Sequence, residues 1–541
     1  MRDDDPAKTD SPKQAPSDAP RSAGGGLLRS TSIVSGMTFL SRILGLVRDV
    51  VFAKFFGAGI LMDAFFIANR IPNMLRRFSA EGAFSQGFVP IMARYRERHQ
   101  HAEAREFIDA MAGTLGLILF GITVIGVIAA PILVTLVAPG FVGDDGRFDL
   151  AALMVRFTFP YLFFVSLVAF AGGILNTYGR FAVPAFTPVL LNVCLIGFAV
   201  YVSPRLANPV MALAYAVLAA GVVQLLFQLP FLARLGVIPR PKFRPRHEGV
   251  RRVGSLMLPA IFGSSVAQLN VLLGGVIASF LGVGKISWLY YSDRLMEFPL
   301  GLFGIALATV TLPHLSRQHT NSEGAAFAAT VDWSMKLVVL IAVPAALGLI
   351  VMAQPIVAAI FYGGEFSTMD VEFTALSLQA FAVGLIGFSF VKILAPAFFA
   401  REDTRTPVKV GLITLAVNFV LSIVFAFVMT RLGLPATHAG LALAISIAAL
   451  LNAWLLYRGL QRDSVIHHSQ GWMPLLIQCA LANVLMVAVL LVMSMPLTSW
   501  LELSVWNRSL VLLGHIFAGA LTYAVVLFAL GLRPSSLRLQ D

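Results

Sequence analysis

The sequence predicts an all-α, polytopic membrane protein with about 14 transmembrane helices. Of its 541 residues, 58% are hydrophobic and 13% are charged, and the mean hydropathy is +0.82. Soluble proteins carry about 25% charged residues. Apolar blocks long enough for the roughly 20 residues of a membrane span follow one another from about residue 31 to residue 532. These observations exclude water-soluble enzymes, fibrous proteins, wholly disordered chains and disulfide-stabilised scaffolds.

Breaks rich in charged residues, Gly or Pro divide the apolar region into candidate spans. The spans are expected near residues 31–56, 60–93, 107–138, 150–175, 183–203, 208–233, 253–281, 287–313, 330–361, 370–399, 407–430, 437–457, 472–495 and 507–532. At about 1.5 Å per residue, the second and ninth blocks are too long for one straight crossing. We expect breaks at Pro72, Gly82 and Pro90 in the second block and at Pro344 and Pro355 in the ninth.

Short motifs recur in the same order at a spacing of about 220 residues, which indicates an internal repeat. Residues 56–59 (FGAG) match residues 281–284 (LGVG), and residues 130–132 (API) match residues 354–356 (QPI). The repeated unit contains six spans, an even number, so both copies enter the membrane in the same orientation. Such a parallel repeat is typical of two-lobed transporters.

The repeat and the composition of the connections divide the chain into five regions. We expect a disordered cytoplasmic tail at 1–26, an N-lobe of spans 1–6 at 27–236, a basic cytoplasmic linker at 237–252, a C-lobe of spans 7–12 at 253–460, and spans 13 and 14 with a cytoplasmic tail at 461–541. The first region is rich in Pro, Ser, Asp and Gly and has no apolar stretch, so it is not a signal peptide.

The net charge of +12 and the isoelectric point near 10.0 come from basic residues in alternate loops. Lys and Arg concentrate at 94–105, 234–252 and 401–409, whereas the longer loops between them, at 144–149 and 365–372, are acidic. Basic loops of membrane proteins stay in the cytoplasm. The pattern therefore predicts that both termini are cytoplasmic, and it explains the basic composition without a nucleic-acid partner.

Ionisable residues inside membrane spans are rare because each costs roughly 3 kcal/mol at the bilayer centre. Here they cluster in spans 1, 2 and 8, and the candidate cavity residues are Arg42, Arg48, Asp49, Asp63, Arg76, Asp293, Arg294 and Glu297. Counting along the spans puts Arg48, Asp49 and Arg294 at one level in the outer half. Asp49 has no basic residue three or four positions before it, so we expect Arg294 to be its partner.

Two further contacts are expected around this level. Arg294 can reach Glu297 at i+3, and Arg42 is the candidate cation between Asp293 and Glu297. Arginine binds phosphate oxygens in bidentate fashion and stays charged, so the cluster favours an anionic, phosphorylated substrate. For Arg76, near the end of its span, interfacial snorkelling is an alternative. Tyr290 could line the cavity or belong to the outer aromatic belt.

The sequence contains no catalytic or metal-binding constellation. It lacks a phosphate-binding GxxxxGK[ST] loop, its histidines have no ligand spacing, and Cys194 and Cys479 each lie within an apolar run. We therefore expect a transporter that is not an enzyme and that uses no cofactor.

Several motifs closely resemble the MurJ/MviN family of lipid II flippases, within the MATE-like (MOP) exporter superfamily. They are SRILGLVRD at 41–49, FGAG at 56–59, DAFF at 63–66, PNMLRR at 72–77, EGAFSQGFVP at 81–90, YYSDRLMEFP at 290–299 and KILAPAF at 392–398. The resemblance extends over about residues 27–532. It implies 14 helices in two lobes around a cationic cavity formed by the eight candidate residues above. It also implies that spans 13 and 14 hold a polyprenyl tail in a hydrophobic groove.

The resemblance further implies a substrate, a location and partners. The substrate is lipid II, the undecaprenyl-diphosphate-linked disaccharide-pentapeptide of peptidoglycan biosynthesis, carried across the bacterial cytoplasmic (inner) membrane by alternating access. Membrane lipids and cell-wall synthesis enzymes are candidate partners. Some members use acidic residues on helices 7 and 11 to bind sodium, but residues 253–281 and 407–430 contain no Asp or Glu here.

Two other functions are compatible with a polytopic protein. An ion-coupled exporter of drugs or of other lipid-linked oligosaccharides is the nearer alternative, but drug exporters of this superfamily have 12 spans and usually acidic cavities. A scaffold or receptor without transport activity does not account for arginines at mid-membrane depth.

Overall fold

The computed structural model describes residues 23–76, 83–97, 101–144, 146–301, 324–466 and 471–533. Within these ranges the regular structure is helical apart from one isolated bridge between Gly363 and Phe366. The predicted all-α class is therefore confirmed.

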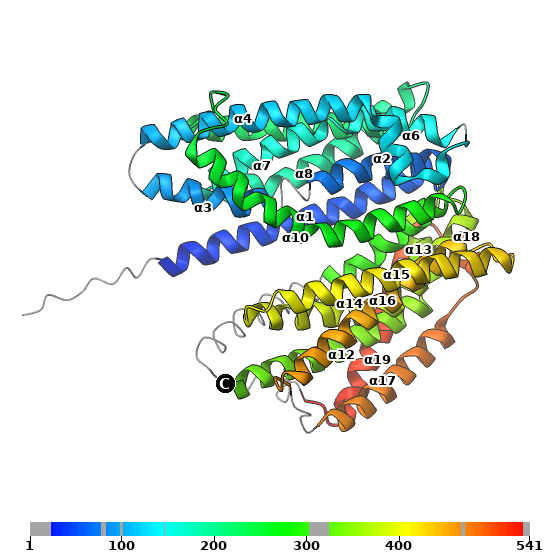
Figure 1. Cartoon of the computed structure of the whole chain (residues 1–541). Helices are drawn as coiled ribbons and strands as arrows, with labels where there is room; N and C mark the ends of the chain where they lie inside the picture. The colour runs from blue at the N-terminus through cyan, green and yellow to red at the C-terminus, as the bar shows by residue number, and fades with distance from the viewer. Residues whose placement is uncertain are drawn as a thin grey trace, which may run out of the picture.

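The described residues of the first half of the chain contain nine α-helices and three short helical turns. They are α1 (Ala23–Phe56), α2 (Ile60–Arg76), α3 (Ala83–Glu97), α4 (His101–Ile128), α5 (Ala130–Val137), η2 (Pro139–Phe141), α6 (Arg147–Thr158), α7 (Tyr161–Thr177), α8 (Ala182–Gly197), η3 (Phe198–Val202), η4 (Ser203–Arg205) and α9 (Met211–Arg234). Helices α7, α8 and α9 pack together, α1 packs on α8, and α2 packs on α6. These contacts build the N-lobe, the upper group of helices in Figure 1.

The second half begins with α10 (Glu248–Ser279) and a helical segment at 285–301. It continues with α12 (Gly324–Val351), α13 (Ala353–Phe361), α14 (Thr368–Ala400), α15 (Arg405–Arg431), α16 (Thr437–Arg462), α17 (Trp472–Met493), α18 (Leu497–Glu502) and α19 (Val505–Ala529). Helix α16 packs on α14 and α15, and α14 packs on α12, which builds the C-lobe. Helix α10 packs on α3 of the N-lobe and on α15 of the C-lobe, and Figure 1 shows it between the two groups.

Spans 13 and 14 correspond to α17 and α19, which pack on each other and on α12. The buried guanidinium of Arg508 fixes this pair to the C-lobe. It donates to the carbonyl oxygens of Trp500 (2.9 Å), Leu501 (3.1 Å), Leu503 (3.0 Å) and, across to α13, Ala358 (3.0 Å). Because all four acceptors are backbone carbonyls, this arginine serves the packing of α18 and α19.

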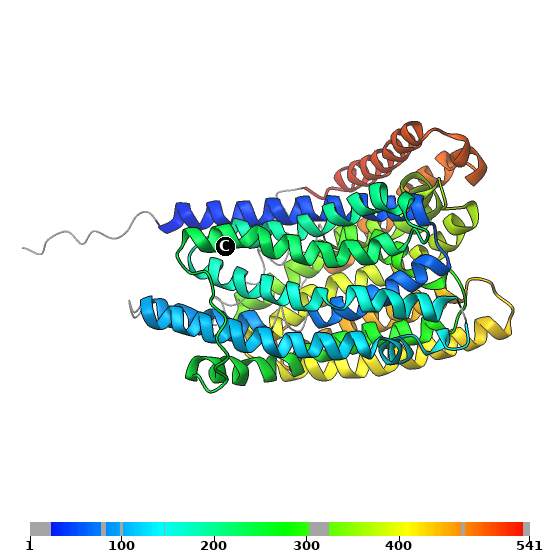
Figure 2. The same ribbon diagram turned by 90° about the horizontal axis from the view of Figure 1, so that it is seen from above.

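The helix axes of both lobes lie roughly parallel to one another when seen from above (Figure 2). In the described part of the chain, ten segments are long and apolar enough to cross a membrane: α4, α6 with α7, α8 to η4, α9, α12, α14, α15, α16, α17 and α19. The chain is thus a multi-pass membrane protein. The other four predicted spans are α1, α2 with α3, α10 and the 285–301 helix, so the total of 14 stays a prediction.

Several predicted boundaries need correction. Of the tail expected at 1–26, residues 1–22 lie outside the described residues. Residues 23–26 belong to α1, because glycines disfavour a helix without preventing it. Pro72, Pro90 and Pro344 lie inside continuous helices, which membrane proteins tolerate. The break in the ninth block comes at Met352, and Pro355 lies in the first turn of α13, where its missing N–H costs nothing. Gly82 lies outside the described residues.

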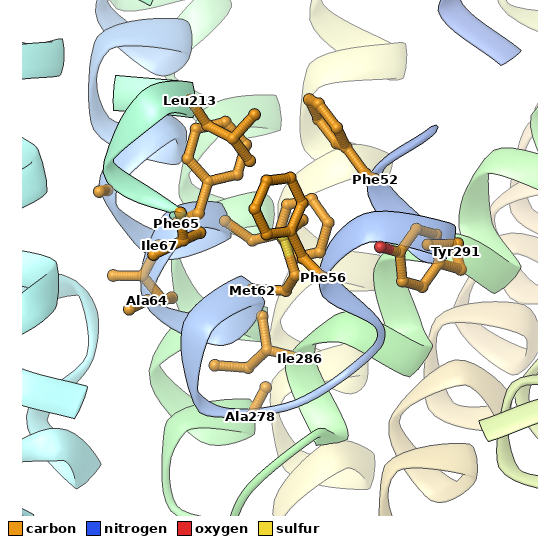
Figure 3. Close-up of a cluster of buried hydrophobic side chains, with 14 of the residues drawn as sticks. Phe52, Phe56, Met62, Ala64, Phe65, Ile67, Leu213, Ala278, Ile286 and Tyr291 are labelled. Carbon is orange, nitrogen blue, oxygen red and sulfur yellow. The ribbon is translucent and has the colours of Figure 1, made fainter. Parts of the chain in front are cut away.

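The two ends of the molecule differ in how their cores are built. At the end formed by residues 54–63, 139–144, 280–287 and 362–367, here called the closed end, one hydrophobic core contains side chains of both lobes. Figure 3 shows part of it, where Phe52, Phe65 and Met62 of the N-lobe lie near Ile286 and Tyr291.

The opposite end carries the loops at 234–247 and 401–405 and is here called the basic end. Its apolar side chains form separate cores. One contains Phe88, Phe107 and Val253, and the other contains Phe327, Phe398 and Leu456. The lobes therefore share one large core at the closed end. At the basic end they meet through α10, whose Val253 packs in the core of α3 and α4, while the other C-lobe helices form a core of their own.

Candidate functional site

A cavity of about 660 Å³ lies between the lobes. It is lined by α1, the end of α2, α7, α8 and α9 from the N-lobe, and by the 285–301 helix and α14 from the C-lobe. The charged residues that line it are Arg42, Arg48, Arg76, Arg294 and Lys392, with Asp49 and Glu297. Five basic and two acidic side chains give the lining a net charge of +3, which favours an anionic occupant.

The deepest part of the site is a network centred on the hydroxyl of Tyr290. This hydroxyl accepts hydrogen bonds from Arg48 Nη2 (3.0 Å) and Arg294 Nε (3.3 Å) and donates to Asp49 Oδ1 (3.1 Å). Its ring stacks on Phe66 at 3.8 Å between centroids. The tyrosine thus joins two arginines and a carboxylate from different lobes, and its donor and both acceptor positions are used.

Asp49 is 1% exposed and has two arginine partners. Arg48 donates to Asp49 Oδ1 from Nε (2.9 Å) and Nη2 (2.7 Å), whereas Arg294 Nε lies 3.7 Å from Asp49 Oδ2. Arg48 also donates to Asn192 Oδ1 (3.1 Å), whose amide donates to the carbonyl of Ser41. A carboxylate this deeply buried needs compensating charge, and here it comes from both lobes.

The charged groups nearer the basic end are more exposed. Arg42 lies six residues before Arg48 on α1, about 9 Å along the axis. Its guanidinium rests against the backbone of Gly301, where a larger residue would collide with it. Lys392 Nζ donates to the carbonyl of Leu300 (3.1 Å), and Arg294 pairs with Glu297 at 2.9 Å. The arginine side chains therefore extend from the buried network toward the basic end.

Asp63 caps a helix of the other lobe. Its carboxylate is fully buried and accepts hydrogen bonds from the backbone N–H of Gly284 (2.7 Å), the backbone N–H of Ser287 (2.9 Å) and the hydroxyl of Ser287 (2.6 Å). These groups begin the 285–301 helix, whose first N–H groups have no partner within the helix. A negative charge at a helix N-terminus is also favoured by the helix dipole.

A second contact between the lobes at the closed end requires glycine. Gly57 has φ +65° and lies so close to the carbonyl of Glu365 that a side chain would collide with it. The Glu365 N–H donates to the carbonyl of Lys54 (3.0 Å), and the hydroxyl of Tyr291 donates to the carbonyl of Gly57 (3.1 Å). The repeated glycine motif is therefore part of the lobe contact and more than a loop connection.

The structure brings six of the eight predicted residues to the cavity: Arg42, Arg48, Asp49, Arg76, Arg294 and Glu297. Asp63 is in the cap and not in the cavity lining, because its side chain points to the N-terminus of the neighbouring helix. Asp293 is half-buried, and it also lies outside the lining.

The expected partners are correct in two of three cases. Asp49 meets Arg294 and Arg294 meets Glu297, as expected. Arg48 is nonetheless the closer partner of Asp49, because the long arginine side chain folds back along its own helix. The placement of Arg42 between Asp293 and Glu297 is wrong, since Arg42 lies against Gly301 and Glu297 is already paired.

Sequence reasoning missed the uncharged polar lining of the N-lobe. It consists of Asn176, Thr187, Asn192, Gln224 and Gln228. Gln228 is fully buried, and neither its amide oxygen nor its amide nitrogen has a hydrogen-bond partner in the described part of the chain. Leaving a buried polar group unpaired costs about 1–3 kcal/mol. Polar residues within otherwise apolar spans were the available signal.

Among the described residues, no group of three or more His, Cys, Asp or Glu is arranged to hold a metal ion.

Comparison with known proteins gives the family. The family model described as lipid II flippase MurJ matches residues 52–510. The chain belongs to the MurJ family. A probable lipid II flippase MurJ of Vibrio cholerae is 46% identical over 519 residues, covering 95% of this chain and 98% of that protein. The lipid II flippase MurJ of Burkholderia cenocepacia is 44% identical, covering 84% of this chain and 87% of that protein.

Solved structures agree with this membership at the level of the fold. A lipid II flippase MurJ in an inward closed conformation matches with a TM-score of 0.73 and 24% identity, over 91% of this chain and 97% of that chain. An inward-facing multidrug resistance MATE family transporter of the MOP superfamily matches with a TM-score of 0.62 and 16% identity, over 79% and 95%. MurJ proteins are transporters, so the chain is a transporter and not an enzyme.

Proposed function

We propose that this chain is a lipid II flippase that binds the substrate diphosphate in the interlobe cavity and carries the headgroup across the membrane by alternating access. The observation that carries the proposal is the network of Arg48, Arg294, Asp49 and Tyr290 at the deep end of a cavity with net charge +3. Arginines bind phosphate oxygens in bidentate fashion, and a water-filled cavity inside the membrane lets them stay charged. A cationic drug is a poor fit to the same lining.

The polyprenyl tail would stay in the membrane outside the cavity. Helices α17 and α19 carry many exposed large apolar side chains, among them Val484, Val492, Phe517 and Phe528. We infer that the tail lies along these helices, since they pack against α12 at the outside of the C-lobe.

In this conformation the lobes are packed together at the closed end. A shared core and the Asp63 cap hold the lobes together at the closed end. At the basic end α10 packs on α3, and α12, α14, α15 and α16 form a core without N-lobe side chains. If the basic end is cytoplasmic, as basic loops favour, the cavity is accessible from the side where lipid II is made. Transport then requires the closed-end contacts to break.

We predict that Arg42→Ala, Arg48→Ala and Arg294→Ala each abolish function without preventing membrane insertion. Each removes a cation from the cavity lining, and a buried carboxylate that loses its partner costs roughly 3–5 kcal/mol. The measurement is complementation of a depletion strain, with immunoblots of membrane levels. Arg431→Ala is the matched control, because this exposed arginine contacts Phe427 outside the cavity. Normal growth of two of the three cavity variants would refute the assignment.

We predict that the basic end is cytoplasmic. Single cysteines introduced at 240–247 should react with a membrane-impermeant thiol reagent only after the cells are opened, whereas cysteines at 142–144 should react in intact cells. Both sets are placed in a background lacking Cys194 and Cys479. Labelling of the first set in intact cells would reverse the orientation and contradict the proposed direction of transport.

We predict that the Asp49–Arg294 contact stabilises the closed end. Asp49→Asn weakens this contact between the lobes, and a few kcal/mol is enough to shift a two-state equilibrium. A cysteine at Leu191 in the cavity should then label faster from outside, and the exchange of Asp49→Arg with Arg294→Asp should restore slow labelling in part.

The control for this experiment is Asp144→Asn. Asp144 accepts from Arg147 (2.6 Å) within the N-lobe, so its loss removes an ion pair at the closed end without changing a contact between the lobes. Unchanged labelling in Asp49→Asn would mean that Asp49 only neutralises the arginines.

A further inference from the structure

The cavity wall has two chemically different sides. The charged groups come mainly from α1, the 285–301 helix and α14, whereas α7, α8 and α9 supply amides and a hydroxyl. The two sides meet at Asn192, which accepts a hydrogen bond from Arg48 (3.1 Å). A ligand whose diphosphate contacts Arg48 would therefore place its next chemical group against the amide side.

Two glutamines one turn apart on α9 differ in their hydrogen bonds. Gln224 is held in place, because its amide nitrogen donates to the carbonyl of Thr187 (2.7 Å) and its oxygen lies 3.4 Å from the hydroxyl of Tyr161. Gln228 is fully buried and has no partner for either amide atom in the described ranges.

Gln228 lies in the cavity wall beside Gly172. The amide nitrogen lies beside Gly172 of α7, near the point where a Cβ on that glycine would stand (3.9 Å), and Gly172 itself lines the cavity. A leucine or methionine at position 228 would fill the same space without an unpaired polar group. The amide is thus costly to the empty protein and is explained by a ligand that pairs with it.

We propose that the amide side of the cavity at α8 and α9, here called the amide wall, is a subsite for the saccharide next to the substrate diphosphate. Gln228 is a specificity-determining residue of this subsite. A carboxamide offers an acceptor and two donors, and sugar hydroxyl and acetamido groups can pair with both kinds, whereas a phosphate oxygen can use only the donors. The saccharide is assigned over the peptide because it is attached directly to the diphosphate, beside the contact of Arg48 with Asn192. This inference rests on the proposed function.

The test compares three ligands on the purified full-length protein in nanodiscs. They are lipid II, undecaprenyl-diphosphate-disaccharide without the peptide, and undecaprenyl diphosphate, with affinities measured by native mass spectrometry. In Gln228→Leu we expect about tenfold weaker binding of the two saccharide ligands, equivalent to about 1.4 kcal/mol. Binding of undecaprenyl diphosphate and the melting temperature should be unchanged or higher. Gln228→Met, closer in length to glutamine, serves as the second variant.

The matched control is Gln379→Leu on α14. Gln379 donates to the carbonyl of Ile350 (3.0 Å) and does not line the cavity, so this change should affect none of the three affinities. Equal binding of all three ligands by Gln228→Leu and wild type would overturn the subsite. Weaker binding of lipid II alone would assign the amide wall to the peptide, and a parallel loss for all three would assign Gln228 to packing. If wild type binds none of them, the proposed function itself fails.

Discussion

The cost of an ionisable side chain in hydrocarbon constrains this structure more than any other interaction. Ten helical segments of the described chain are long and apolar enough to cross a membrane, and α1, α2 and the 285–301 helix, which carry most of the charged residues expected within the membrane, are not among them. The charged side chains of these three helices must face protein or water. Their place beside the cavity follows from this requirement, because α1, the end of α2 and the 285–301 helix line it together with α7, α8, α9 and α14.

The two ends of the cavity differ in the side chains that form them. At the closed end, aromatic rings of both lobes pack into one core, as with Tyr291, which contacts Phe66 at 5.7 Å and Phe361 at 5.0 Å between ring centroids. Asp63 adds three hydrogen bonds to backbone and hydroxyl groups across the lobes. The contact consists mainly of buried apolar side chains and includes few polar groups. Such an arrangement suits a contact that has to open and re-form during a transport cycle.

Much of the fold could be predicted from the sequence because hydropathy, loop charge and repeat symmetry are one-dimensional signals. The all-α class, the two lobes and the contact of Asp49 with Arg294 follow from them. The direction of a side chain around its helix axis is a weaker signal where charges occur on several faces. This is why Asp63 and Asp293 were expected in the cavity. The pairing of Arg48 with Asp49 was missed, since adjacent residues on a helix do not face each other and only the length of arginine permits it. Gln228 carries no charge, and its polarity within an apolar span is a weaker signal than a charge at that depth.

We propose that the closed-end contacts between the lobes hold one state of a two-state transporter, and replacing Asp63 is the sharpest test of this proposal. Spin labels on cysteines at Val142 and Met369, exposed residues of the N-lobe and the C-lobe at that end, report the separation by double electron–electron resonance. The protein is reconstituted in nanodiscs without Cys194 and Cys479. In Asp63→Ala, which removes the cap from the 285–301 helix, we expect a new population at longer distance that is absent or minor in wild type. An identical distance distribution in both proteins would contradict it.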